Sequence, residues 1–137
     1  MKPDLSPYLA FEGKAREALN FYSEALGGEP LFETYGAYNA SDDPNDRDRV
    51  LYGVIRSPYG FVLRATDVPS KERLTPGNNY YICINGDDNE LIRKIWDRLA
   101  RNATITKPLE VAEWGDAYGQ LVDRFGVTWQ INIGESE

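Results

Sequence analysis

The chain has 137 residues, 42% of them hydrophobic, and its 22 acidic and 15 basic residues give a net charge of −7. This length suits one domain, and the charge disfavours nucleic acid and anionic membrane surfaces as partners. Histidine is absent and Cys83 is the only cysteine, which excludes a Ser-His or Cys-His catalytic pair and a disulfide within the chain. No apolar run approaches the length of a membrane span, and we expect a cytoplasmic protein.

The first half of the chain predicts a strand, a helix and three further strands. These elements are expected at residues 6–11, 13–26, 30–35, 49–56 and 61–66. Gly27 and Gly28 end the helix, since glycine accepts the left-handed conformation found after helix C-termini. A turn at residues 57–60 joins the last two strands, and the polar loop at residues 39–48 is expected to be the most mobile segment.

The second half repeats this order after a linker at residues 67–78 that is rich in proline and glycine. Asp87 or Asp88 can cap its helix. A shift of the first copy along the sequence superposes Gly13 on Gly86, as expected for a repeated supersecondary unit. Strands are expected at residues 80–84, 111–114, 118–123 and 127–133, and the apolar stripe of the helix spans residues 91–99.

Two runs, FEGKAREALNFYSEALGG and EWGDAYGQLVDRFGVTWQINI, resemble the PhnB-like branch of the vicinal oxygen chelate superfamily, which includes glyoxalases, extradiol dioxygenases and bleomycin-resistance proteins. The resemblance covers nearly the whole chain. It implies an α+β fold with two tandem βαβββ modules, residues 1–68 and 79–137 of a single domain 1–137. Their mixed sheets would form a cup, and two chains would pair as a homodimer.

In the metal-dependent members of this superfamily, histidine and glutamate ligands come from the first and last strands of each module. The resemblance puts the corresponding positions near Pro7 and Arg64 in the first module and near Tyr80 and Gln130 in the second. Proline has no donor side chain, and the arginine cation would repel a metal ion. We therefore expect no metal, and without a glycine-rich phosphate loop we expect no nucleotide cofactor. Some members carry the name of a ubiquinone methyltransferase, but no segment resembles a methyl-donor site.

A metal-free cup that binds a small molecule is the main prediction. Strand alternation places Arg64 and Gln130 on the same face as their second neighbours along each strand. The predicted ligand-binding residues are Arg64, Tyr80, Trp114, Gln130 and Asn132, with an apolar floor of Leu9, Phe11, Ile82 and Ile84. An arginine there favours an anionic ligand. The alternative is that Arg64 pairs with one of the protein's own acids, such as Glu113 or Asp116.

The sequence leaves open whether a reaction is catalysed. The enzyme alternative is a lyase, isomerase or dioxygenase-type activity, in which Glu113 or Asp116 would act as general acid or base. A local role for these two carboxylates in a turn is the competing interpretation. Cys83 is expected to face the helix side of its sheet as a buried thiol. A third possibility is an interaction module whose cup is filled by its own side chains.

Overall fold

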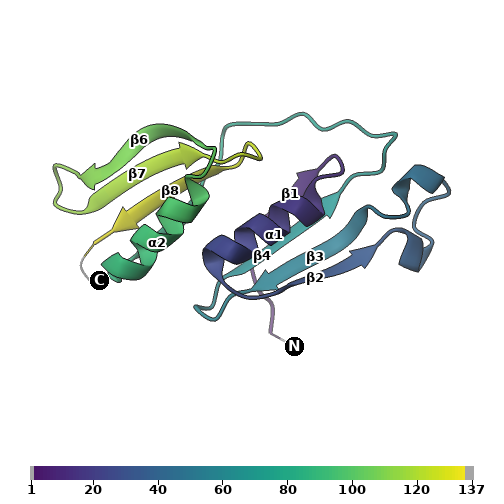
Figure 1. Cartoon of the computed structure of the whole chain (residues 1–137), viewed down its shortest axis with the longest axis horizontal. Coiled ribbons are helices and arrows are strands. Elements are labelled where there is room, and N and C mark those ends of the chain that lie inside the picture. The colour runs from purple at the N-terminus through teal and green to yellow at the C-terminus, as the bar shows by residue number, and fades with distance from the viewer. Residues whose placement is uncertain (1, 135–137) are drawn as a thin grey trace. The chain divides into compact units, whose positions relative to one another are not determined.

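A computed structural model describes residues 2–134 and divides between Pro76 and Gly77 into two compact units (Figure 1). The division falls within the predicted linker. Each unit holds one four-stranded mixed sheet with one helix on one of its faces. This confirms the predicted α+β class and the two βαβββ modules. Across residues 2–134, no helix is both long enough and apolar enough to cross a membrane.

The sheet of the first unit has the strand order β1-β4-β3-β2, with β1 parallel to β4 and the other pairs antiparallel. Its elements are β1 (Tyr8–Phe11), α1 (Ala15–Leu26), β2 (Pro30–Thr34), the short 3-10 turns η1 (Gly36–Tyr38) and η2 (Pro44–Asp46), β3 (Val50–Arg56) and β4 (Val62–Asp67). The predicted strands of this half are all present, with ends that differ by one or two residues.

The first turn of α1 is capped by Asp67 at the end of β4. One carboxylate oxygen accepts hydrogen bonds from the backbone N–H groups of Gly13 and Ala15, both at 2.9 Å. The other oxygen accepts from the N–H of Val50 in β3 at 3.0 Å. A single buried carboxylate thus joins the helix to two strands, because free N–H groups at a helix start need acceptors.

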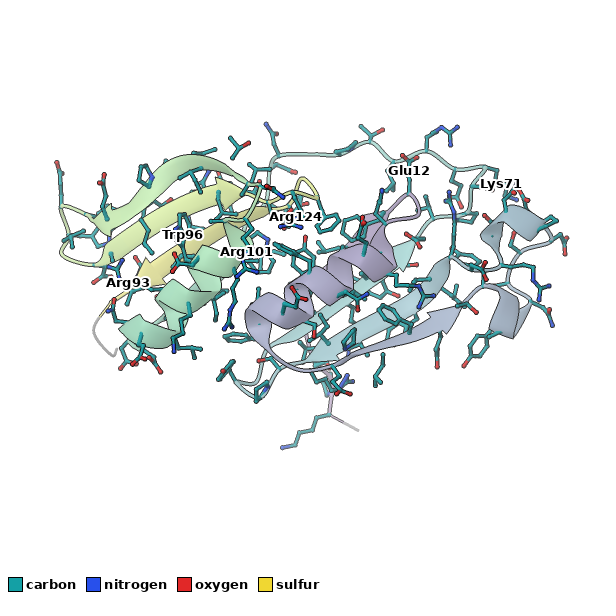
Figure 2. The ribbon with its side chains drawn as sticks, viewed as in Figure 1. Glu12, Lys71, Arg93, Trp96, Arg101 and Arg124 are labelled. Atoms are coloured by element: carbon teal, nitrogen blue, oxygen red, sulfur yellow. The ribbon has the colours of Figure 1, made fainter. Side chains whose placement is uncertain are left out.

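The second unit has the equivalent order β5-β8-β7-β6, again with one parallel pair, between β5 and β8. Its elements are β5 (Ile82–Gly86), α2 (Asn89–Leu99), β6 (Thr104–Val111), β7 (Ala117–Val122) and β8 (Thr128–Ile133). Asp88 caps α2 through a hydrogen bond from the N–H of Leu91 at 3.1 Å, as predicted. Figure 2 shows Trp96 on α2, and a Cβ on Gly119 of β7 would lie 2.9 Å from its ring.

The strand predicted at residues 111–114 is wrong in position. The strand β6 occupies Thr104–Val111, and the chain then turns, with Ala112 accepting a hydrogen bond from the N–H of Gly115. Because β6 lies at a sheet edge, it tolerates Pro108 and is exposed along most of its length. Its sequence therefore lacks the alternation of apolar and polar residues that identifies a half-buried strand.

Matching turns show the internal repeat in detail. In the first unit Ser57 N–H donates to the carbonyl of Phe61, and in the second Asp123 N–H donates to the carbonyl of Val127. Gly60 and Gly126 take the same place in these turns, with φ of 90° and 86°. The two modules thus have the same type of turn directly before β4 and β8, the strands that carry the predicted site residues.

The loop at residues 39–48 is anchored around Asp46, which is buried. Its carboxylate accepts hydrogen bonds from Ser41 Oγ at 2.6 Å and from the N–H of Ser70 at 2.8 Å. These bonds, that of Ser41 above all, lower the pKa of Asp46. The loop is thereby tied to the beginning of the linker, and its mobility stays a prediction.

Candidate functional site

Each sheet has a face covered by its helix and an open face. In β4, Leu63 and Ala65 are buried while Arg64 and Thr66 between them are partly exposed, so the latter two lie on the open face. In β8 the open face carries Gln130 and its second neighbours. The open-face residues of these two strands are Val62, Arg64, Thr66, Thr128, Gln130 and Asn132. Their common orientation within each strand agrees with the predicted alternation.

The first strand of each module faces the opposite way from the prediction. Tyr8 lies beside Arg64 in the parallel pair of β1 and β4, so Tyr8 shares the open face. Leu9 and Phe11 are buried on the helix side. The prediction placed these two apolar side chains on the floor of the cup. They lie on the opposite face because the apolar side of α1 packs against an apolar face of the sheet.

The same correction applies to β5. Cys83 lies beside Gln130 in register, so it is on the open face and exposed, whereas a buried thiol on the helix side was predicted. Although the residue is exposed, neighbouring side chains partly desolvate its thiol, which raises the pKa of Cys83. Ile82 and Ile84 lie beside Trp129 and Ile131, on the face covered by α2.

The guanidinium of Arg64 donates four hydrogen bonds. Its Nη1 and Nη2 donate to the two carboxylate oxygens of Asp4, each at 3.1 Å, and its Nε donates to Tyr52 Oη at 3.1 Å. Nη1 also donates to Ser6 Oγ. The hydrogen bond from Arg64 lowers the pKa of the Asp4 carboxyl, and the same bond raises the pKa of Arg64. Arg64 therefore pairs with an acid of its own unit, one that the sequence did not single out.

Exposure differs sharply across this ion pair. The side chain of Arg64 is 15% exposed and that of Asp4 is 54% exposed. The guanidinium is set into the sheet, while its acidic partner comes from residues 2–7, which form neither helix nor strand. Arginine and carboxylate meet here through two parallel hydrogen bonds, the geometry in which arginine also binds carboxylate ligands.

Tyr118 on β7 contacts several side chains of the second unit. Gln130 Nε2 donates to Tyr118 Oη at 2.6 Å, and Tyr118 Oη donates to Gln120 Oε1 at 3.5 Å. The ring of Trp114 packs edge-on against the Tyr118 ring, with centroids 5.5 Å apart. Lys107 Nζ lies 5.6 Å from the same ring centroid, within the range of a cation–π contact.

A second polar cluster adjoins Asn132. Its Nδ2 donates to Asp116 Oδ2 at 3.0 Å and to Asn85 Oδ1 at 3.1 Å. Asp116, directly before β7, thus contacts the open-face residue Asn132 of β8, whereas Glu113 is exposed in the turn after β6. Only one of the two candidate acids therefore joins a network with a predicted ligand-binding residue.

The predicted binding residues divide into three groups. Gln130, Asn132 and Trp114 lie on or beside the polar face of the second unit, and Arg64 lies on the open face of the first. Tyr80 is exposed and precedes β5. Sequence reasoning missed Asp4, Tyr52 and Asn85, and no local signal marks Asp4.

The residues at the superfamily's metal-binding positions do not fit a metal ion. Arg64 is a cation bound to Asp4, and Gln130 is hydrogen-bonded to Tyr118. Among residues 2–134, no group of three or more histidine, cysteine, aspartate or glutamate side chains is arranged to hold one. Zinc and iron sites are built from such donors.

Comparisons with known proteins agree with this architecture. The family model described as 3-demethylubiquinone-9 3-methyltransferase matches residues 3–132. The protein PA1353 from Pseudomonas aeruginosa is 27% identical, with a TM-score of 0.81 over 98% of this chain and 100% of that one. A PhnB protein from Bacillus cereus is 24% identical, with a TM-score of 0.78 over 96% and 100% of the two chains.

A more distant structure places the fold in a wider group. A glyoxalase/bleomycin resistance/dioxygenase family enzyme from Burkholderia phytofirmans is 16% identical, with a TM-score of 0.63 over 96% of this chain and 98% of that one. At this identity the likeness shows the fold alone. The chain belongs to the family described as 3-demethylubiquinone-9 3-methyltransferase, whose model it matches, and it shares its fold with this glyoxalase/bleomycin resistance/dioxygenase family enzyme.

Proposed function

We propose that this protein binds a small molecule on the open sheet faces without the help of a metal ion. The observation that carries the proposal is the pair of half-buried polar sets on these faces, around Arg64 in one unit and Tyr118 in the other. Polar side chains set among aromatic rings are the usual composition of small-molecule sites. The proposal does not include methyl transfer, because no segment of the two open faces resembles a site for a methyl donor.

Ligand screening by thermal shift tests this proposal. We expect members of a panel of small carboxylates, phosphonates and neutral amides to raise the melting temperature, because a ligand held by the native state stabilises it. Zinc, nickel, manganese and iron(II) should give no comparable shift, and mass spectrometry of the purified protein should find no stoichiometric metal. Stoichiometric metal, or a panel without any stabilising compound, would contradict the proposal.

The enzyme alternative rests on Asp116 rather than on Glu113. Asp116 is hydrogen-bonded to Asn132 on the open face, where a bound molecule could reach it. If a compound from the panel is turned over, the Asp116→Asn variant should lose that turnover while Glu113→Gln keeps it. Equal turnover by wild type and Asp116→Asn would remove Asp116 as a general acid or base.

We further propose that the protein is a cytoplasmic homodimer. Strands β2 and β6 each lie at an edge of their sheet, and Leu31 and Val111 on these strands are largely exposed. Natural proteins tend to cover such edges. Light scattering at micromolar concentration should give twice the mass of the chain, and the mass of a single chain would refute this assembly.

A further inference from the structure

We propose that Asp4 is a tethered, displaceable occupant of a carboxylate-binding site at Arg64, so that the segment 2–7 competes with a ligand for this arginine. This inference rests on the proposed binding function and names the ligand class for the first unit: a small carboxylate with an apolar or aromatic body.

The guanidinium of Arg64 is fixed in place independently of Asp4. Its Nε donates to Tyr52 Oη at 3.1 Å, and the strand that carries it, β4, is paired on both sides, with β1 and β3. The two terminal nitrogens are thereby aimed out of the sheet as a preset fork. A fork fixed by its scaffold loses little entropy on binding a carboxylate, which favours affinity.

Asp4 fills this fork in the way an external carboxylate would. Both of its oxygens accept from the two terminal nitrogens, at 3.1 Å each. The segment that carries it has no regular structure, and the neighbouring Leu5 is fully exposed. The hydrogen bonds shown for Asp4 and Ser6 go to Arg64. Displacing Asp4 therefore breaks its hydrogen bonds with Arg64. It exposes no apolar surface of Leu5, because that side chain is already exposed.

The surroundings of the fork favour an anion with an apolar body. Arg56 lies on the same face, and its charge also lowers the pKa of Asp4, so two cations act on one carboxylate. The acid of the neighbouring strand, Glu33 on β2, interacts with Tyr38 and raises the pKa of that phenol. The rings of Tyr8 and Tyr52 lie beside the fork, with centroids 6.2 Å apart, and Tyr8 is 52% exposed. A ligand carboxylate can thus replace that of Asp4 while its body contacts Tyr8.

Benzoate is a suitable probe, and its affinity can be measured by calorimetry on the full chain. The Asp4→Asn variant should bind benzoate roughly tenfold more tightly than wild type, since a site that is free one-tenth of the time shows one-tenth of its intrinsic affinity. Asp42→Asn is the matched control: it removes the same charge from an exposed position of the same unit and should bind like wild type. Arg64→Lys should lose binding in either background, because lysine cannot form the two parallel bonds.

The possible results separate this inference from the proposed function. A variant lacking residues 2–6 should bind like Asp4→Asn, which guards against an effect peculiar to that one substitution. Equal benzoate affinity in wild type, Asp4→Asn and the shortened chain would overturn the competition by Asp4. Absence of benzoate binding in all of them would overturn the carboxylate site, while stabilisation by a neutral compound of the panel would leave the proposed function standing.

Discussion

Replacing Asp67 with alanine is expected to destabilise the first unit strongly. The carboxylate is 2% exposed and accepts hydrogen bonds from the backbone N–H groups of Gly13, Ala15 and Val50. Each buried donor left without an acceptor costs about 1–3 kcal/mol. We expect a loss of about 4 kcal/mol in the free energy of unfolding, measured by urea denaturation.

Two control substitutions test whether the lost hydrogen-bond acceptors of Asp67 cause this destabilisation. Asp67→Asn keeps one oxygen acceptor and should lose about half as much stability, because either the helix start or Val50 keeps its partner. Asp88→Ala removes the cap of α2 at an exposed position and should cost only about 1 kcal/mol. If Asp67→Ala were no more destabilising than Asp88→Ala, the buried carboxylate would not be what joins α1 to the strands.

The position of Asp67 links this stability to the candidate site. It ends the strand that carries Arg64 and Thr66, and its own carbonyl accepts from Tyr35 Oη at 2.6 Å. The same residue thus fixes the helix on one face of the sheet and the end of β4, whose other face presents the arginine. Loss of the cap should therefore weaken ligand binding at Arg64 as well as stability.

Much of the fold follows from local signals in the sequence. The apolar stripe of α1 and the alternation of β4 and β8 predict which residues each element buries, and the repeated turns at Gly60 and Gly126 mark the duplication. The strand β6 was misplaced because an exposed edge strand has no apolar pattern to detect. The faces of β1 and β5 were reversed because their apolar residues suit a cup floor and a helix interface equally well.

The site was predictable only where it depends on alternation along a strand. Arg64, Gln130 and Asn132 lie on open faces as expected, since period two is a local property. The partner of Arg64 is 60 positions away in the sequence, in a segment without regular structure. Such a contact depends on the path of the chain across the sheet, which no local pattern records. That the arginine is internally paired was anticipated, but Asp4 was not.

Gly28→Ala is expected to be the second most damaging substitution. Gly28 follows α1 with φ of 88°, and a Cβ there would lie 2.5 Å from the carbonyl oxygen of Arg56. A positive φ alone costs an alanine about 1–2 kcal/mol. The clash adds to this cost because backbone atoms of a paired strand cannot rotate away as a side chain can. We expect a loss of about 3 kcal/mol or more in the free energy of unfolding.

Gly60→Ala separates the two contributions to this loss. Gly60 has nearly the same φ, 90°, but a Cβ there would meet no atom within 4 Å. The control should therefore show the conformational cost without the clash, about 1–2 kcal/mol. Equal losses in the two variants would mean that the close approach of Gly28 to β3 is readily relieved. A larger loss for Gly28→Ala would show that the connection between α1 and β2 requires glycine for space as well as for conformation. Because Arg56 lies at this connection, the same variant should also shift Arg56 relative to Asp4.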